Sequence, residues 1–235
     1  MDSVWFRTEP AHRPRLSRKR IVQAAVGLLD VSGLDGFSMR ALARRLGVAP
    51  MSVYEYVSGR EDVLDFALDA VIGEIEPAAD GMPWRDAVLE QLCRMREVML
   101  RHRWMPTLMS TRPLIGPNAL RRSERFHASL IEAGLTGATL VAAVGALTNY
   151  AIGFAAAESS WWATVRTPEG DKQIRSAVAE HLAAHAPLLA QHAPVELDDF
   201  DEQFRLGAEV ILDGIAMRSS GCRCRSGSRD DSDRS

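Results

Sequence analysis

Apolar residues recur at intervals of three and four along most of the chain, which is the spacing of one face of an α-helix. The sequence shows no alternation of apolar and polar residues typical of half-buried strands, and no internal repeat. It therefore predicts an all-α protein. We expect helices at about residues 17–32, 38–46, 50–56, 61–72, 84–102, 105–110, 118–133, 136–159, 171–186 and 198–217.

Residues 38–60 have the pattern of two short helices joined by a tight turn. Ser38 is a good N-cap for the first helix, because its hydroxyl can accept a hydrogen bond from a free backbone N–H. Gly47 ends that helix, and Pro50 suits the first turn of the next. Two such helices form a helix-turn-helix, whose second helix can enter the major groove of DNA. A helical hairpin inside any all-α core has the same spacing, so the motif alone leaves both interpretations open.

Two further helices flank this motif. Residues 17–32 place Ile21, Ala25 and Leu29 on one face, and Gly33 is expected to end that helix. Residues 61–72 carry acidic side chains in the first turn, where the helix dipole favours negative charge. The motif is therefore part of a larger helical unit.

The order of these features resembles the DNA-binding domain of the TetR family, named for the tetracycline repressor. A helix is followed by Gly-Leu-Asp-Gly-Phe-Ser at residues 33–38, then by a second helix and Leu-Gly-Val. Val-Tyr-x-Tyr-Val at residues 53–57 and a basic residue then precede a long helix. The resemblance runs without a gap over about residues 17–75.

The rest of the chain resembles, more loosely, the ligand-binding domain of the tetracycline-repressor branch. The shared features are Thr-Arg-Pro at residues 111–113, Gly-Pro-Asn-Ala-Leu at 116–120 and an apolar helix around 145–153. The resemblance implies an N-terminal three-helix helix-turn-helix DNA-binding domain and a C-terminal helical ligand-binding and dimerisation domain. The expected segments are a flexible basic arm at 1–16, the DNA-binding domain at 17–62, the ligand-binding and dimerisation domain at 63–218 and a disordered tail at 219–235.

The charge distribution agrees with a DNA-binding N-terminal end. Residues 1–60 hold ten basic and five acidic residues, a net charge of +5, and the whole chain carries −3, so the remainder carries −8. A basic end on an acidic body is the electrostatic pattern of a nucleic-acid-binding protein. About half of these basic residues lie at or before residue 20, where simple solvation is the alternative, and the others lie on the helix-turn-helix, which favours DNA contact.

The resemblance also implies roles for single residues. Arg40 takes the position expected to reach a guanine edge, for which a guanidinium is suited. Met51 heads the second helix and can pack on a thymine methyl group. Tyr54, Tyr56 and Arg60 match positions that hold phosphates, although core packing explains either tyrosine equally well. The expected DNA-contacting set is Ser38, Met39, Arg40, Pro50, Met51, Ser52, Tyr54, Glu55, Tyr56 and Arg60.

The same resemblance implies a ligand pocket that lacks the metal site of the tetracycline repressor. The histidine that binds the drug's magnesium there falls at Leu108 here, and the second acid near the metal falls at Ala157. We therefore expect no metal and no cofactor, and a hydrophobic or aromatic small molecule as the ligand. Ordinary core packing is the alternative for each wall residue. The expected ligand-binding set is Gln91, Met95, Trp104, Leu108, Thr111, Phe126, Asn149, Phe154 and Trp161.

Two helices of the C-terminal domain are expected to form a homodimer interface. The helix at 136–159 is rich in glycine and alanine, which permits close approach of helix backbones, and the last helix carries an apolar stripe from Phe204 to Ile215. Either stripe can instead face the core of its own subunit. We expect a bound ligand to act through the helix at 61–76, which joins the DNA-binding domain to the pocket wall.

Signals of other protein classes are weak. Residues 140–157 carry no charge but are barely long enough to span a bilayer, so we expect a core helix. The N-terminus lacks the features of a secretory signal, which predicts a cytoplasmic protein. Cys93, Cys222 and Cys224 have no metal-ligand spacing, and we expect them to be reduced. His181 and His185 are placed to share a metal on one helix face, but the spacing supplies no third ligand.

These observations predict a DNA-binding transcriptional regulator rather than an enzyme, since no phosphate loop, dinucleotide fingerprint or catalytic triad stands out. We expect a repressor that binds a palindromic operator as a homodimer and is released by a small hydrophobic or aromatic ligand. Two alternatives stay open: a helical enzyme that converts a small molecule, and a DNA-binding activator without ligand control. Saturable binding without turnover separates the regulator from the enzyme.

Overall fold

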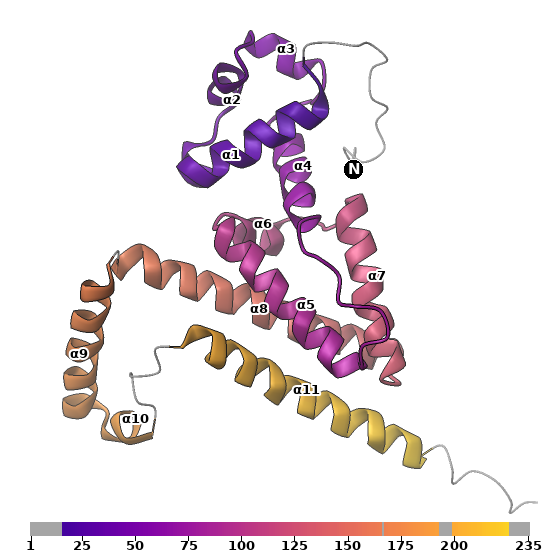
Figure 1. The fold of residues 1–235 in the computed structure, drawn as a ribbon, viewed down its shortest axis with the longest axis vertical. Coiled ribbons are helices and arrows are strands. Elements are labelled where there is room, and N and C mark those ends of the chain that lie inside the picture. Colours follow the sequence, from indigo (N-terminus) through magenta and orange to yellow (C-terminus); the bar gives the residue numbers. More distant parts are fainter. Residues whose placement is uncertain (1–15, 166, 193–198, 226–235) are drawn as a thin grey trace, which may run out of the picture.

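The computed structural model describes residues 16–165, 167–192 and 199–225, and all regular elements in these ranges are helices (Figure 1). The all-α prediction is confirmed. The helices are α1 (Arg18–Gly36), α2 (Met39–Leu46), α3 (Pro50–Tyr54), α4 (Arg60–Ile72), α5 (Trp84–Arg101), α6 (Met105–Thr111), α7 (Pro117–Glu132), α8 (Gly137–Val165), α9 (Pro168–His185), α10 (Pro187–His192) and α11 (Phe200–Arg225).

The first three helices form a small head (α1–α3) that is carried on α4 (Figure 1). Ser17 and Ser38 cap α1 and α2, because their hydroxyls accept hydrogen bonds from the backbone N–H groups of Arg20 and Ala41. Gly47 follows α2 with φ of 70°, a left-handed conformation that glycine adopts without strain. The predicted pair of helices and the turn between them are confirmed.

The chain turns at Gly33, as predicted, but helical structure resumes after it. Gly33 has φ of 65° and ψ of −173°, which is not helical, and one more turn follows as far as Gly36. α1 is therefore kinked at this glycine, and the kink directs the chain toward α2.

One continuous apolar core joins the head to the C-terminal helices. Leu42 and Val53 are fully buried within the head, and Leu92 and Leu130 are equally buried further along the chain. Between them, eight of the 13 residues of α4 are buried, so this helix is enclosed on most of its circumference. α4 is thus the element through which the head and the C-terminal helices share their packing.

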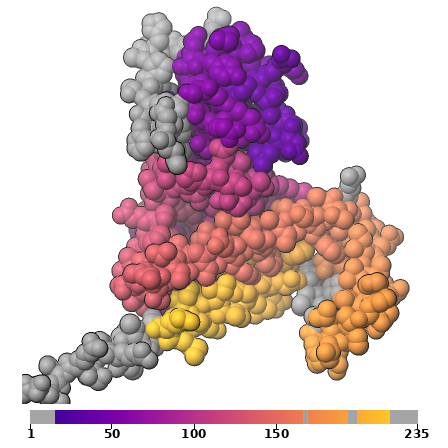
Figure 2. Space-filling model, turned by 180° about the vertical axis from the view of Figure 1, so that it is seen from behind, coloured from indigo at the N-terminus to yellow at the C-terminus, as the bar shows by residue number. Residues whose placement is uncertain are grey.

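The C-terminal helices pack around α5 and α8. α5 contacts α7, α8 and α11, and α8 also packs on α6, α7 and α11. Figures 1 and 2 show the two long helices α8 and α11 side by side along one face of the molecule, with α9 and α10 at the far end of α8. The cavity described below lies on the other side of α8, toward α7.

Two predicted boundaries are wrong. Trp161 and Trp162 belong to α8 rather than to a loop, because residues 160–165 include no glycine or proline that would end a helix. The first such residue is Pro168, which disfavours helical conformation in the residue before it. α11 continues to Arg225, so the first residues of the expected disordered tail are helical. Residues 1–15 of the expected arm and residues 226–235 of the expected tail lie outside the described residues.

The sequence predicts that α8 is a core helix, but only one face of it is buried in this chain. Ala143, Leu147 and Ala151 on its inner face are buried, whereas Val141 is 68% exposed. Within the described ranges, α8 alone is long and apolar enough to cross a bilayer, a weak criterion that core helices of soluble proteins also meet. Only 22% of its most apolar window is buried within this one chain, so its outer face is an apolar surface that is open in the monomer.

Candidate functional sites

α3 presents an exposed surface at the tip of the head (Figure 1). Val53 anchors the helix by being fully buried, while Met51 is 73% exposed and Tyr54 is 43% exposed. Pro50 begins the helix, where its missing N–H costs no hydrogen bond. Met51 therefore presents an apolar side chain at the start of α3, and the N-terminal residues of a recognition helix are those that contact base edges.

α2 presents one exposed basic side chain at its start. Arg40, its second residue, is exposed, and Met39 beside it is half-buried against the core. The Ser38 hydroxyl is 3.2 Å from the backbone N of Ala41 and is therefore used for capping. Of these three expected contacts, Arg40 has the side chain that can extend furthest from the head.

Arg60 and Tyr56 have partners inside the protein. Nη2 of Arg60 donates a hydrogen bond of 3.1 Å to the Leu34 carbonyl oxygen, and its guanidinium lies 5.8 Å from the centroid of the Phe37 ring. Arg60 therefore ties the start of α4 to the connection between α1 and α2. Tyr56 is half-buried and packs against the core, in line with the packing alternative. The remaining expected DNA contacts are half-buried Ser52 and exposed Glu55.

The expected DNA-contacting set omitted two basic residues at the end of α2. Arg44 and Arg45 are both exposed. Arg45 lies against Gly27 of α1, where an added Cβ would come within 2.7 Å of its Nη2 atom. Their position off the apolar stripe of residues 38–46 was the available signal, since side chains there must face solvent or a ligand.

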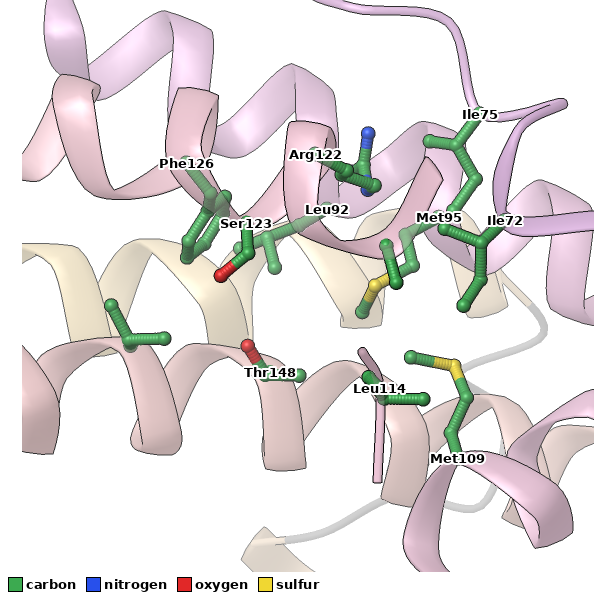
Figure 3. A pocket seen from close by; sticks show the side chains of 12 residues that line it. Ile72, Ile75, Leu92, Met95, Met109, Leu114, Arg122, Ser123, Phe126 and Thr148 are labelled. Atoms are coloured by element: carbon green, nitrogen blue, oxygen red, sulfur yellow. The ribbon is translucent and has the colours of Figure 1, made fainter. Parts of the chain in front are cut away.

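A cavity of about 200 Å³ lies among α4, α5, α7 and α8 (Figure 3). Its wall is mostly aliphatic, with one aromatic ring and three polar side chains, a composition typical of sites for small apolar ligands. Residues from the end of α4 line it, so an occupant contacts the helix that carries the head. The lining residues are Ile72, Ile75, Leu92, Met95, Met109, Leu114, Ala119, Arg122, Ser123, Phe126, Val144 and Thr148.

Arg122 is the one charged residue of this wall. Its Nη2 donates a hydrogen bond of 2.8 Å to the Gln91 carbonyl oxygen, and no carboxylate within the described residues forms an ion pair with it. Burial, together with the positive charge of Arg94, lowers the pKa of the Arg122 guanidinium to about 10. The group is still a cation at neutral pH, held in a mostly apolar surrounding.

Met95 and Phe126 are the two expected ligand residues that line the cavity. Gln91 is buried on α5 and faces a separate hollow against the loop at residues 77–82. Leu108 is buried beside Met109, which does line the cavity, and Thr148 lines it where Asn149 was expected. Thr111 and Asn149 are exposed.

The other three expected ligand residues are held elsewhere. Nε1 of Trp104 donates a hydrogen bond of 2.7 Å to Asp30 of the head. The Phe154 ring packs edge-on against Phe204, with ring centroids 5.2 Å apart. Trp161 donates through Nε1 to Asp171 of α9. None of these three rings reaches the cavity wall, so the structure does not bring the predicted pocket together as one site.

Polar contacts connect the cavity wall to α4. The buried Asp69 carboxylate accepts hydrogen bonds from the backbone N–H groups of Asn118 and Ala119, at 3.1 and 2.9 Å, and Ala119 also lines the cavity. Burial raises the pKa of Asp69 above its ordinary value, against the opposing effect of these donors. Arg112 pairs with Asp65 of α4 at 2.5 Å. α4 is therefore hydrogen-bonded to the start of α7.

Comparison with known proteins matches both halves of the chain. Residues 21–65 match the family model "Bacterial regulatory proteins, tetR family", and residues 76–219 match "Tetracyclin repressor-like, C-terminal domain". The chain is 44% identical to an HTH-type transcriptional regulator of Saccharopolyspora erythraea over 91% of each protein. It is 33% identical to the HTH-type transcriptional repressor DrrR1 of Streptomyces coeruleorubidus, over 87% of this chain and 79% of DrrR1.

Solved structures give the same assignment. Apo ActR from Streptomyces coelicolor is 30% identical, with a TM-score of 0.77, over 90% of this chain and all of ActR. ActR in complex with actinorhodin superposes with a TM-score of 0.76 at the same identity, over 88% of this chain and 99% of ActR. The predicted resemblance is confirmed in both domains.

Proposed function

Because this chain belongs to the TetR family, it is a DNA-binding transcriptional regulator, and we propose that it is a repressor that binds a palindromic operator as a homodimer. We propose further that a small hydrophobic or aromatic molecule in the cavity releases it from DNA. DrrR1 is named a transcriptional repressor, and ActR has been solved with actinorhodin bound. Both relatives support this reading of the chain.

The apolar face along α8 and α11 supports a homodimer. Leu206, Val210 and Met217 on α11 are 54%, 72% and 77% exposed, and Val141 on α8 lies exposed on the neighbouring helix. Small residues of α8, such as Ala146, line a groove between the two helices. A second copy of this face can cover the first by two-fold symmetry, which a paired operator also requires.

The proposed interface uses a different stripe of α11 from the one predicted. Phe204, Ala208 and Leu212 are completely buried in their own subunit, and Ile215 is 7% exposed. These residues continue the core rather than the outer surface. The residues available to a partner are those about half a turn away, including Val210.

The cavity supports a ligand that is largely apolar. Nine of its twelve wall residues are aliphatic, aromatic or methionine, so filling it removes apolar ligand surface from water. No group of three or more potential metal ligands occurs among the described residues. An apolar ligand also fits the loss of the tetracycline repressor's metal histidine, whose position holds Leu108.

The contact between the cavity wall and α4 carries the proposal. Ile72 is the last residue of α4, Ile75 lies three residues beyond it, and Ala119 comes from the start of α7, which Asp69 holds. A ligand that pushes these walls apart must shift α4, and the head on it moves with it. A paired operator reads the spacing of two heads, so a small tilt of α4 in each subunit lowers affinity for DNA.

The proposal is tested by selecting DNA sites from a random pool and then screening aromatic compounds for release, in buffer containing EDTA. We expect the selected sites to contain two inverted half-sites about one or more helical turns apart. We also expect releasing compounds to be recovered unchanged, which excludes the enzyme alternative. Sites with a single half-site, or release that requires a divalent metal, would contradict the proposal.

A further inference from the structure

We propose that the effector carries an anionic group, such as a carboxylate, sulfonate or ionised phenol, that pairs with Arg122 while its apolar body fills the cavity. This inference rests on the proposed function, because it assigns the chemistry of the ligand in the same cavity. An apolar ligand needs only to fill the cavity. This inference requires in addition that the ligand carry one negative charge, placed next to Arg122 on the wall.

The first support is the position of Arg122. Figure 3 shows it on α7 at the edge of the open space, with its nitrogen directed away from Ser123 and Thr148. A guanidinium has five N–H donors in a planar fork that matches two oxygens of an acid. The contacts of the described residues use one of them, on the Gln91 carbonyl oxygen. The Gln91 carbonyl lies inside α5, where its oxygen accepts a helical hydrogen bond, so it does not depend on Arg122 for a donor.

Two other arginines, buried Arg96 and half-buried Arg112, show what half-buried Arg122 lacks among the described residues. Arg96 holds both oxygens of buried Glu158, with Nε and Nη2 at 2.7 and 2.8 Å, and also contacts Asp201. Arg112 pairs with Asp65 and Glu61. Arg122 instead has a second cation, Arg94, in its neighbourhood. A half-buried cation that no carboxylate of the described residues pairs with is partly desolvated without compensation, and an anionic ligand lowers that cost on binding.

Two hydroxyl groups supply further polar atoms on the cavity wall, apart from the Arg122 nitrogen. Figure 3 shows the side chains of Ser123 on α7 and Thr148 on α8 on facing walls, each with its hydroxyl directed toward the space between them. Hydroxyl groups can donate to an acidic oxygen or to a ring substituent. The ligand is therefore expected to be amphiphilic, with its acid at Arg122 and its apolar part against Met109, Leu114 and Val144.

A purely structural role for Arg122 is the competing explanation. In that case the guanidinium only links α7 to α5 through the Gln91 carbonyl, and ligand charge is irrelevant. The two roles differ in one observable, the selectivity for an acid over the same molecule without its acid. Stability alone does not separate them.

The test uses two dyes with one skeleton. 8-Anilinonaphthalene-1-sulfonate carries a sulfonate, and N-phenyl-1-naphthylamine is the same skeleton without it; both fluoresce more strongly in apolar sites. Dissociation constants are measured for wild type, Arg122→Met, Arg122→Lys and Arg125→Gln. Arg125 is exposed on the same helix and does not line the cavity, so its variant controls for a general loss of positive charge. Met95→Trp fills the cavity without adding charge and shows whether a dye occupies it.

The selectivity of each protein is the dissociation constant of the neutral dye divided by that of the sulfonate dye. We expect this ratio to be at least about tenfold higher for wild type and Arg125→Gln than for Arg122→Met, a difference of about 1.4 kcal/mol. Arg122→Lys should keep part of the preference, and Met95→Trp should weaken both dyes. Equal selectivity in wild type and Arg122→Met, with the neutral dye still bound, overturns the anionic-group proposal alone. A wild type that binds neither dye, or dyes unaffected by Met95→Trp, contradicts the cavity proposal as well.

Discussion

The carboxylate of Asp69 on α4 accepts two hydrogen bonds from Asn118 at the start of α7, one from its backbone N–H at 3.1 Å and one from its side-chain Nδ2 at 3.0 Å. Asp69 is 6% exposed, and it also accepts from the backbone N–H of Ala119. It therefore satisfies N–H groups that the first turn of α7 leaves without helical partners. The helix that carries the head and the helix that walls the cavity share this one carboxylate.

Replacing Asp69 by alanine is expected to weaken the coupling between cavity and operator. The variant leaves the N–H groups of Asn118 and Ala119 buried and unpaired, which should lower the free energy of unfolding by about 1–3 kcal/mol. The ratio of operator dissociation constants with and without a releasing compound should also fall toward one, because α7 no longer holds α4.

Denaturant unfolding and fluorescence anisotropy with a labelled operator measure the two effects. Glu124→Ala, an exposed position on α7, is the control and should change neither. An Asp69→Ala protein whose operator affinity still responds fully to the compound would show that the signal takes another path.

Replacing Arg40 by alanine is expected to weaken operator binding by about 1–3 kcal/mol and to relax the preference for one base pair. Its side chain is exposed at the start of α2. Binding isotherms on a set of operators with single base changes measure both effects. Unchanged affinity on every sequence would place the recognition surface elsewhere in the head.

Arg60→Ala is expected to lower affinity evenly across those operators and to reduce the salt dependence by about one counter-ion. Because Arg60 also binds the Leu34 carbonyl oxygen, its variant should melt at a somewhat lower temperature than wild type. A loss confined to one base pair, with an unchanged salt slope, would assign Arg60 to base readout instead.

Replacing Val210 by aspartate should produce monomers. Val210 is 72% exposed in the single chain, so the change should leave the subunit folded while it puts charge into the proposed interface. Sedimentation should show the monomer mass, and operator affinity should fall roughly a hundredfold, because two linked heads no longer bind together. Ile211 is an unsuitable test site, since it packs partly against its own core. A wild type that sediments as a monomer at micromolar concentration would exclude the interface altogether.

Buried Arg96 and half-buried Arg122 should respond oppositely to replacement by methionine. Arg96→Met leaves Glu158, which is 5% exposed, without its partner and should destabilise the protein by about 3–5 kcal/mol. Arg122→Met removes an unpaired cation and should leave the melting temperature of the ligand-free protein unchanged or raised. Calorimetric melting curves of both variants measure this difference. A large destabilisation by Arg122→Met would show that its hydrogen bond to the Gln91 carbonyl oxygen outweighs the cost of burying the charge.

The head could be predicted from the sequence because its signals are local. Ser38, Gly47 and Pro50 each act on the backbone within a few residues, as a cap, a left-handed turn and a helix start. The family resemblance carried by the order of those signals assigned Arg40 and Met51 to the expected DNA-contacting set. Both side chains are exposed in the structure.

The cavity could be predicted only in part, because its wall depends on how helices rotate against one another. Met95 and Phe126 line it, but Thr148 lines it in place of its neighbour Asn149, and a shift of one residue turns a side chain by about 100° around a helix. Trp104 is held away from it by Asp30, more than 70 positions distant in sequence. Arg122 was missed since a charged residue on an amphipathic helix ordinarily indicates a solvated face.

In the proposed function, the cavity among α4, α5, α7 and α8 controls operator binding. The most direct test is to measure operator dissociation constants for wild type and Met95→Trp, with and without each compound that releases wild type from DNA. Leu188→Trp, at an exposed position on α10, is the matched control. We expect Leu188→Trp to be released like wild type, whereas the operator dissociation constant of Met95→Trp should be the same with and without compound, because the indole occupies the cavity. A Met95→Trp protein whose operator dissociation constant rises at the same compound concentration as that of wild type would exclude this cavity as the controlling site.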